Sequence, residues 1–136
     1  MDFNNNLKII YGEAFEGCKN IKEIHFGKNL SKIYYGSFKD CVGLTEIILP
    51  KKIKLIGRAA FAGCTNLKKI IIPKSCKHLS EMLDNNPNLT EIIYEGTLEE
   101  WKNVKGFDYI FIEDHPFSLS NDEIDLDTIE DENNVD

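Results

Sequence analysis

One apolar pattern recurs along this 136-residue chain at a spacing of 23 residues. Three copies begin at Leu7, Leu30 and Ile53, and a fourth copy, one residue shorter, begins at Cys76. Because a unit this short cannot enclose a core alone, the copies must stack and bury their equivalent residues against one another. The repeat therefore predicts a solenoid of about four units. The equivalent positions are Ile10, Ile33, Ile56 and Leu79; Phe15, Phe38, Phe61 and Leu83; and Cys18, Cys41, Cys64 and Asn86.

Each copy continues with a segment in which apolar residues alternate, and Leu67, Ile70 and Ile72 form the clearest example. Alternation with a period of two indicates a β-strand. Strands of successive units would lie about 4.8 Å apart, so we expect a parallel sheet on one face of the solenoid. Ladders of identical side chains would fill the core beneath this sheet, and the phenylalanine ladder would be the bulkiest.

Two phrases of the third unit carry a family resemblance. The pattern I-G-x-x-A-F-x-x-C is formed by Ile56, Gly57, Ala60, Phe61 and Cys64, and N-L-x-x-I-x-I-P by Asn66, Leu67, Ile70, Ile72 and Pro73. Residues 7–96 are similar to the BspA-like (Treponema pallidum type) leucine-rich repeats. This resemblance implies an α/β repeat fold, a short right-handed leucine-rich-repeat solenoid with a parallel sheet on one face and short strands or irregular turns on the other. Family members are mostly surface or secreted proteins that bind other proteins.

An open solenoid needs a cap at each end, because its exposed edges otherwise invite pairing. Residues 1–6 form only the remnant of an N-terminal cap, in which Phe3 is the one plausible lid. If this cover is too thin, the first unit frays or is covered by a partner or by a second copy of the chain. At the other end we expect a C-terminal cap over residues 97–112. Thr97 and Glu100 have capping-box spacing there, which predicts a helix from about Leu98 to Val104, and 107–112 alternate like a last strand.

The net charge of −7 is the sum of two unlike parts. Residues 1–112 hold all 16 Lys and Arg and 13 Asp and Glu, a balance of +3, whereas residues 113–136 hold 10 Asp and Glu and no Lys or Arg. A block of like charges with few apolar residues is typically a solvated extension. The sequence therefore predicts a disordered acidic tail at 113–136.

No pattern in the chain supports catalysis or a cofactor. Cys18, Cys41 and Cys64 share one repeat position and Cys76 occupies a core position, so the thiols are expected to be buried, unpaired and weakly hydrogen-bonded to the backbone. The histidines do not converge, no zinc-ligand spacing is present, and the tail lacks the glycine and glutamate of a calcium loop. We therefore predict that the chain is not an enzyme, with no catalytic, cofactor or metal residues.

The repeat register predicts which side chains share the outer face of the sheet. One stripe would be apolar over three units, and a second stripe beside it would be charged. An apolar stripe rimmed by charge is typical of an interaction surface, although β-branched residues also simply favour strands. The predicted partner-binding residues are His25, Ile48, Ile71 and Ile93 in the first stripe and Glu23, Glu46, Lys69 and Glu91 in the second.

Lysines stack at equivalent turn positions, Lys28 with Lys51 and Lys74, and Lys54 with Lys77. Like charges at this spacing repel, which predicts that anionic groups lie near these lysines. The acidic tail is the nearest candidate, either folding back onto its own chain or reaching a basic partner. A solvated face with ordinary dependence on ionic strength is the alternative.

These patterns together predict a noncatalytic module that binds a protein partner through its sheet face. Two alternatives remain: an inhibitor whose acidic tail mimics nucleic acid, and a fragment of a cell-surface adhesin. The start of the sequence shows no signal peptide, and no apolar run approaches the roughly 20 residues of a membrane span, so the expected location is cytoplasmic. We expect no direct contact with nucleic acid. Homo-oligomers that form through the exposed solenoid end remain an alternative.

Overall fold

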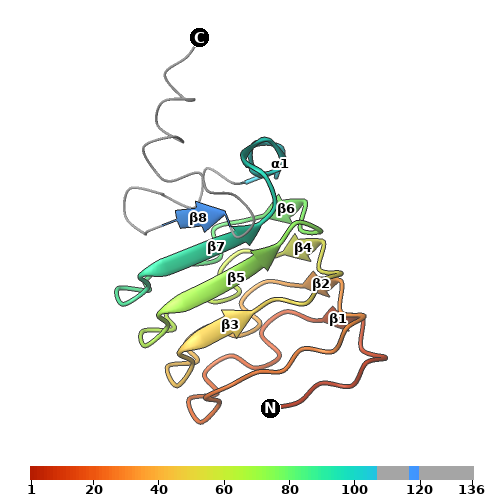
Figure 1. Cartoon of the computed structure of the whole chain (residues 1–136). Coiled ribbons are helices and arrows are strands. Elements are labelled where there is room, and N and C mark those ends of the chain that lie inside the picture. Colours follow the sequence, from red (N-terminus) through yellow and green to blue (C-terminus); the bar gives the residue numbers. More distant parts are fainter. Residues whose placement is uncertain (107–116, 120–136) are drawn as a thin grey trace.

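The structure is a computed structural model that describes residues 1–106 and 117–119. Within these residues the chain forms a parallel β-solenoid of about four turns (Figure 1), which confirms the predicted stacking. One sheet has the strand order β1-β2-β4-β6 and consists of two-residue strands: β1 Ile9–Ile10, β2 Lys32–Ile33, β4 Leu55–Ile56 and β6 His78–Leu79. The other has the order β3-β5-β7-β8 and the longer strands: β3 Glu46–Ile48, β5 Lys69–Pro73, β7 Glu91–Glu95 and β8 Phe117–Leu119.

Strand pairing follows the spacing of the repeat. In the sheet of short strands, Ile33 lies opposite both Ile10 and Ile56, one residue from each neighbouring unit. In the other sheet, Ile70 lies opposite Ile47 and Ile92 in the same way. Equivalent residues of successive units are therefore direct neighbours. Because strand side chains alternate between faces, these buried isoleucines line the core and the residues between them face outward.

A ladder of phenylalanines runs through the core, as predicted. The rings of Phe38 and Phe61 are fully buried and stack with centroids 5.6 Å apart and an interplanar angle of 9°. Phe15 stacks on the other side of Phe38 at 5.2 Å and the same angle. Stacked rings at this separation attract one another beyond the burial of their surface. The ladder therefore couples the first three units.

One turn position in each unit takes the left-handed backbone conformation. The residues there are Gly17, Asp40, Gly63 and Asn85, with φ between 59° and 73°. Glycine adopts this conformation without steric cost, and Asp and Asn tolerate it better than other residues do. A second turn position is also left-handed, and it holds a glycine in only one of the first three units. Gly36 occupies it in the second unit, whereas Glu13 occupies it in the first and Ala59 in the third.

The N-terminal residues continue the repeat backwards. Asp2 forms a parallel bridge with His25, 23 residues later, and the Phe3 N–H donates to the carbonyl of His25 at 3.0 Å. The Phe3 ring lies 5.4 Å from that of Phe15 and 5.9 Å from that of Phe26. Phe3 is thus the lid that the sequence predicts. Residues 1–6 are held by repeat-like pairing, which sequence inspection did not recognise because the segment is so short.

The C-terminal helix α1 spans Leu98–Lys102. Its predicted capping box is present: the Glu100 N–H donates to Thr97 Oγ1 at 3.1 Å, and the Thr97 N–H donates to Glu100 Oε1 at 3.0 Å. Trp101 and Val104 are buried against the last unit. The helix therefore caps the core, although it is shorter than predicted.

β8 pairs with β7 on the side away from β5, with Ile92 opposite Phe117 and Tyr94 opposite Leu119. These residues belong to the segment 113–136, and the prediction of a disordered tail is wrong for 117–119. The reason is local: Phe117 and Leu119 are apolar residues two positions apart, both buried, and the Phe117 ring lies 4.9 Å from that of Trp101. The strand predicted at 107–112 and the remainder of the tail lie outside the described residues.

Candidate interaction surface

Cys41, Cys64 and Cys76 are buried in the core, as predicted, whereas Cys18 of the first unit is only half-buried. Cys41 Sγ donates to the carbonyl of Phe15 at 3.2 Å, and Cys64 Sγ donates to that of Phe38 at 3.3 Å. In the fourth unit the Asn86 amide makes the equivalent bond to the Phe61 carbonyl at 3.1 Å, which explains why an amide stands at a cysteine position. All four cysteines are free.

The buried thiols are poorly suited to act as nucleophiles. Burial raises the pKa of Cys41 to about 11, of Cys64 to about 12 and of Cys76 to about 11. The thiolate, which is the reactive form, is therefore scarce at neutral pH. Cys76 Sγ lies 3.6 Å from the backbone carbonyl of His78. These contacts give the thiols a structural role.

Residues 1–106 and 117–119 hold no group of three His, Cys, Asp or Glu side chains arranged to bind a metal ion. The same residues include no helix long and apolar enough to cross a membrane.

The predicted apolar stripe lies on the outer face of the longer-stranded sheet. Ile48, Ile71 and Ile93 are direct neighbours on β3, β5 and β7. Ile48 is 51% exposed, whereas Ile71 and Ile93 are half-buried. The exposed Ser118 of β8 continues the row beyond Ile93. The stripe therefore has its most accessible apolar side chain on β3 and ends in a hydroxyl on β8.

The second predicted stripe alternates in charge. Lys69 of β5 lies between Glu46 of β3 and Glu91 of β7. Opposite charges on neighbouring strands attract each other across the sheet, so this row is electrostatically compatible with its own fold. It gives the apolar stripe a charged border along one side.

His25 and Glu23 lie in the first unit and form a small polar cluster with the N-terminal segment. His25 Nδ1 lies 2.7 Å from Asp2 Oδ1, and its Nε2 lies 3.0 Å from Glu23 Oε1. The hydrogen bond with Glu23, followed by that with Asp2, raises the pKa of His25. His25 and Glu23 are therefore engaged with each other, and the apolar part of the stripe begins at Ile48.

A depression of about 430 Å³ lies between the first unit and β3. Within the described residues β3 is the end strand of its sheet, and the segment around His25 bridges to Asp2 on its other side without pairing with β3. Sequence inspection missed this depression, since the first unit matches the repeat pattern. Its signal is that His25 and Phe26 replace the isoleucine and leucine of the next unit. The lining consists of Asn5, Ile24, His25, Phe26, Lys28, Ile48, Leu49, Pro50 and Lys51.

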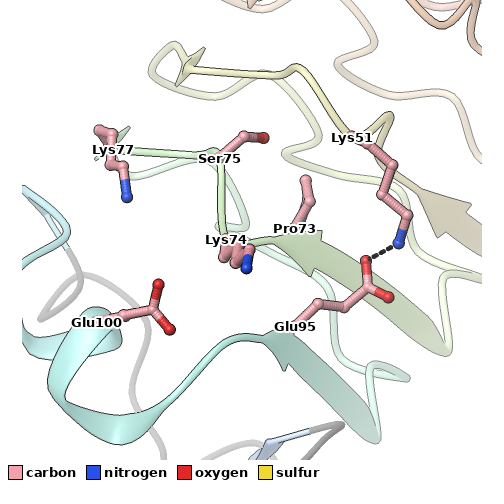
Figure 2. A pocket seen from close by; sticks show the side chains of 7 residues that line it. All are labelled: Lys51, Pro73, Lys74, Ser75, Lys77, Glu95 and Glu100. Carbon is pink, nitrogen blue, oxygen red and sulfur yellow. Dashed lines mark hydrogen bonds and ion pairs between the residues drawn. The ribbon is translucent and has the colours of Figure 1, made fainter.

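A second cleft, of about 460 Å³, lies among the stacked lysines (Figure 2). Lys51 Nζ pairs with Glu95 Oε1 at 2.6 Å across it. Glu100 also borders this cleft. Its pKa is lowered by the hydrogen bond that it accepts from the Thr97 backbone and, to a smaller extent, by the nearby Lys74 and Lys77. Glu95 and Glu100 are therefore two of the anionic groups that the sequence predicts near the lysines.

Three solved structures are similar to the described fold. A leucine-rich cell surface protein from Faecalibacterium prausnitzii shares 30% identity over 69% of this chain and 25% of that chain, with a TM-score of 0.67. The T. pallidum leucine-rich repeat protein TpLRR shares 25% identity over 68% and 44% of the two chains, with a TM-score of 0.62. A leucine-rich repeat protein from Bacteroides ovatus shares 26% identity over 82% and 28%, with a TM-score of 0.68.

This chain therefore spans between a quarter and a half of the length of these structures. No curated protein matches it. The family model of the BspA type leucine-rich repeat region matches residues 1–110 in six copies. Six copies agree with four units flanked by the partial ones around Asp2 and Lys105, each of which bridges to a neighbouring unit. The chain belongs to the family of BspA-type leucine-rich repeat proteins.

Proposed function

We propose that this chain is a noncatalytic module that binds a protein partner through the outer face of its longer-stranded sheet. The fold of BspA-type repeats is typical of interaction or surface modules rather than of enzymes. The observation that carries the proposal is the 51% exposure of Ile48 at the edge of an apolar depression. A large apolar side chain that is exposed to solvent beside a concavity is a suitable anchor for a partner's side chain.

The binding surface would extend from Ile48 over Ile71 and Ile93, with Glu46, Lys69 and Glu91 as its charged rim. A rim of both signs disfavours wrongly charged partners and fixes the register of the right one. Four paired strands are only about 15 Å across. The sheet face therefore fits a small epitope or one extended segment, together with the depression beside β3.

The experiment replaces Ile48 with Asp in the full chain. Partners captured from native cells by the wild-type chain are identified, and their affinity is measured directly by calorimetry. Ile48→Asp puts a charge where the proposal places an apolar contact, and we expect at least a tenfold loss of affinity, about 1.4 kcal/mol. Because Ile48 is exposed, the fold should survive, which circular dichroism checks.

Tyr35→Asp is the matched control. Tyr35 is 48% exposed, nearly the same fraction as Ile48, and lies in the turn after β2, away from the longer-stranded sheet. This variant introduces the same charge and removes a similar apolar surface. Equal loss in both variants, or no loss in either, would reject the sheet face as the binding surface.

A second function is favoured by one comparison, since a similar structure is described as a cell surface protein. We propose as an alternative that this chain is part of a surface protein, in place of the cytoplasmic location expected from its sequence. Antibody labelling of intact cells, compared with lysed cells, separates the two locations. The remaining alternative, a tail that mimics nucleic acid, rests on residues outside the described part of the chain.

A further inference from the structure

Five exposed lysines form one edge of the solenoid, at the turns that lead from the longer-stranded sheet to the sheet of short strands. We call this surface the lysine edge: Lys28, Lys51, Lys54, Lys74 and Lys77. The unit spacing places Lys28, Lys51 and Lys74 at equivalent turns, with backbones about 4.8 Å apart from one unit to the next. The Lys77 N–H donates to the Lys54 carbonyl at 3.0 Å, so these two residues are also neighbours in adjacent units.

The described body neutralises this edge only in part. Glu95 pairs with Lys51, and Glu100 borders the cleft that Lys74 and Lys77 line (Figure 2). Glu100 is also bound to the Thr97 backbone in the capping box. Among residues 1–106 and 117–119, Lys51 is the only member of the lysine edge with an ion pair. In this cleft three lysines thus accompany two carboxylates, and one of these carboxylates is already shared with the helix cap.

The chain leaves β8 at the same end of the sheet. β8 runs parallel to β7, and its last residue, Leu119, lies opposite Tyr94, which directly precedes Glu95. β7 in turn pairs with β5, where Pro73 lies opposite Glu95 and directly precedes Lys74. β8 therefore points towards the lysine edge and ends two strands away from β5, the strand that leads to Lys74.

The 17 residues that follow have the charge that this edge lacks. Residues 120–136 contain eight Asp and Glu and no Lys or Arg. At about 3.3 Å per residue the segment can reach roughly 55 Å. Four strand spacings separate β8 from the first unit, about 20 Å. Its length is therefore sufficient to pass along every lysine of the edge.

We propose that the lysine edge binds the acidic segment 120–136 of its own chain through ion pairs. Tethering to β8 keeps the local concentration of the segment high, so individually weak pairs act together. Exposed pairs are screened by salt, and the contact is strongest at low ionic strength. The bound segment would cover the lysine edge and leave the outer face of the sheet accessible. The proposal is thus independent of the function proposed for that face.

The test is zero-length carbodiimide cross-linking of the full chain, read out by mass spectrometry. This reagent joins ammonium and carboxylate groups that are in contact. We expect links between the lysine edge and the acidic residues of 120–136 at about 0.01 M salt, where the Debye length is about 30 Å, and a severalfold loss at about 1 M, where it is about 3 Å. Mixing ¹⁵N-labelled and unlabelled chains shows whether each link lies within one chain.

Two triple variants provide the matched comparison. Replacing Lys51, Lys74 and Lys77 with Gln removes three of the five lysines of the edge, whereas replacing Lys19, Lys22 and Lys68 with Gln removes the same charge from exposed positions elsewhere. Amide chemical shifts of residues 120–136, measured by NMR, should change in the first variant and stay at wild-type values in the second.

Equal shifts in both variants, links spread evenly over all lysines, or no links at low salt would overturn the proposal. Links found only between labelled and unlabelled chains would also overturn it, because they would make a second copy the occupant. Circular dichroism and the melting temperature show that each variant is folded before it is compared.

Discussion

The phenylalanine ladder makes Phe38 the residue whose loss should cost most in the core. Phe38 is fully buried, and its ring contacts four others, those of Phe3, Phe15, Phe26 and Phe61, at centroid distances of 5.2 to 6.4 Å. Removing a buried phenylalanine ring typically costs about 3 to 5 kcal/mol in unfolding free energy, and the cost is larger where the site cannot collapse.

Collapse is restricted at this position. The Phe38 N–H donates to Ala60 O at 2.8 Å, and the N–H of Phe15 donates to Ser37 O at 2.8 Å, so backbone hydrogen bonds hold the flanking units at their spacing. We therefore place Phe38→Ala near the upper end, at about 4 to 5 kcal/mol. For a chain of 136 residues the melting temperature should fall by about 10 to 30 °C.

Urea unfolding followed by far-UV circular dichroism measures this cost, with Phe15→Ala as the control. Phe15 is only half-buried at the first unit, so its loss should cost about half as much, roughly 2 kcal/mol. A loss below about 2 kcal/mol for Phe38→Ala, or one no larger than for Phe15→Ala, would refute the ladder as the main source of coupling between units.

Further predictions concern the caps, the turns and the thiols. Thr97→Ala removes the capping-box acceptor and should cost about 1 kcal/mol in urea unfolding, while Ala59→Gly relieves a left-handed alanine and should raise stability by up to about 1 kcal/mol. The pKa of His25 is raised by Glu23 and then by Asp2, so these pairings stabilise the N-terminal segment below the ordinary histidine pKa, and their contribution is lost as pH rises through the folded-state value. In an NMR titration, Asp2→Asn should therefore lower the pKa of His25, and an unchanged value would contradict the pairing. Of the four thiols, only the half-buried Cys18 should react with a thiol reagent in the native protein, and all four should react without reductant once it is unfolded.

The sequence was sufficient to predict the solenoid because the repeat is regular. A spacing of 23 residues fixes which side chains stack, and the pairing of Ile48 with Ile71 and of Ile71 with Ile93 follows directly from it. The capping box at Thr97 could also be predicted from the sequence, since its two residues, Thr97 and Glu100, are only three positions apart.

The departures from prediction occur where the repeat stops being regular. β8 was missed because Phe117 and Leu119 follow an interruption of the repeat and lie inside an acidic stretch, yet two buried side chains were enough to add a strand. The depression beside β3 was missed because the periodicity predicts that the first unit continues the sheet, whereas within the described residues β3 is its end strand.

Hydrogen exchange on the chain with its captured partner tests the central claim most directly. If the sheet face is the binding surface, binding should slow amide exchange in β3 and β5, around Ile48 and Ile71, and leave the turn around Tyr35 unchanged. Protection confined to the Tyr35 side, with β3 and β5 exchanging as in the free chain, would contradict the account.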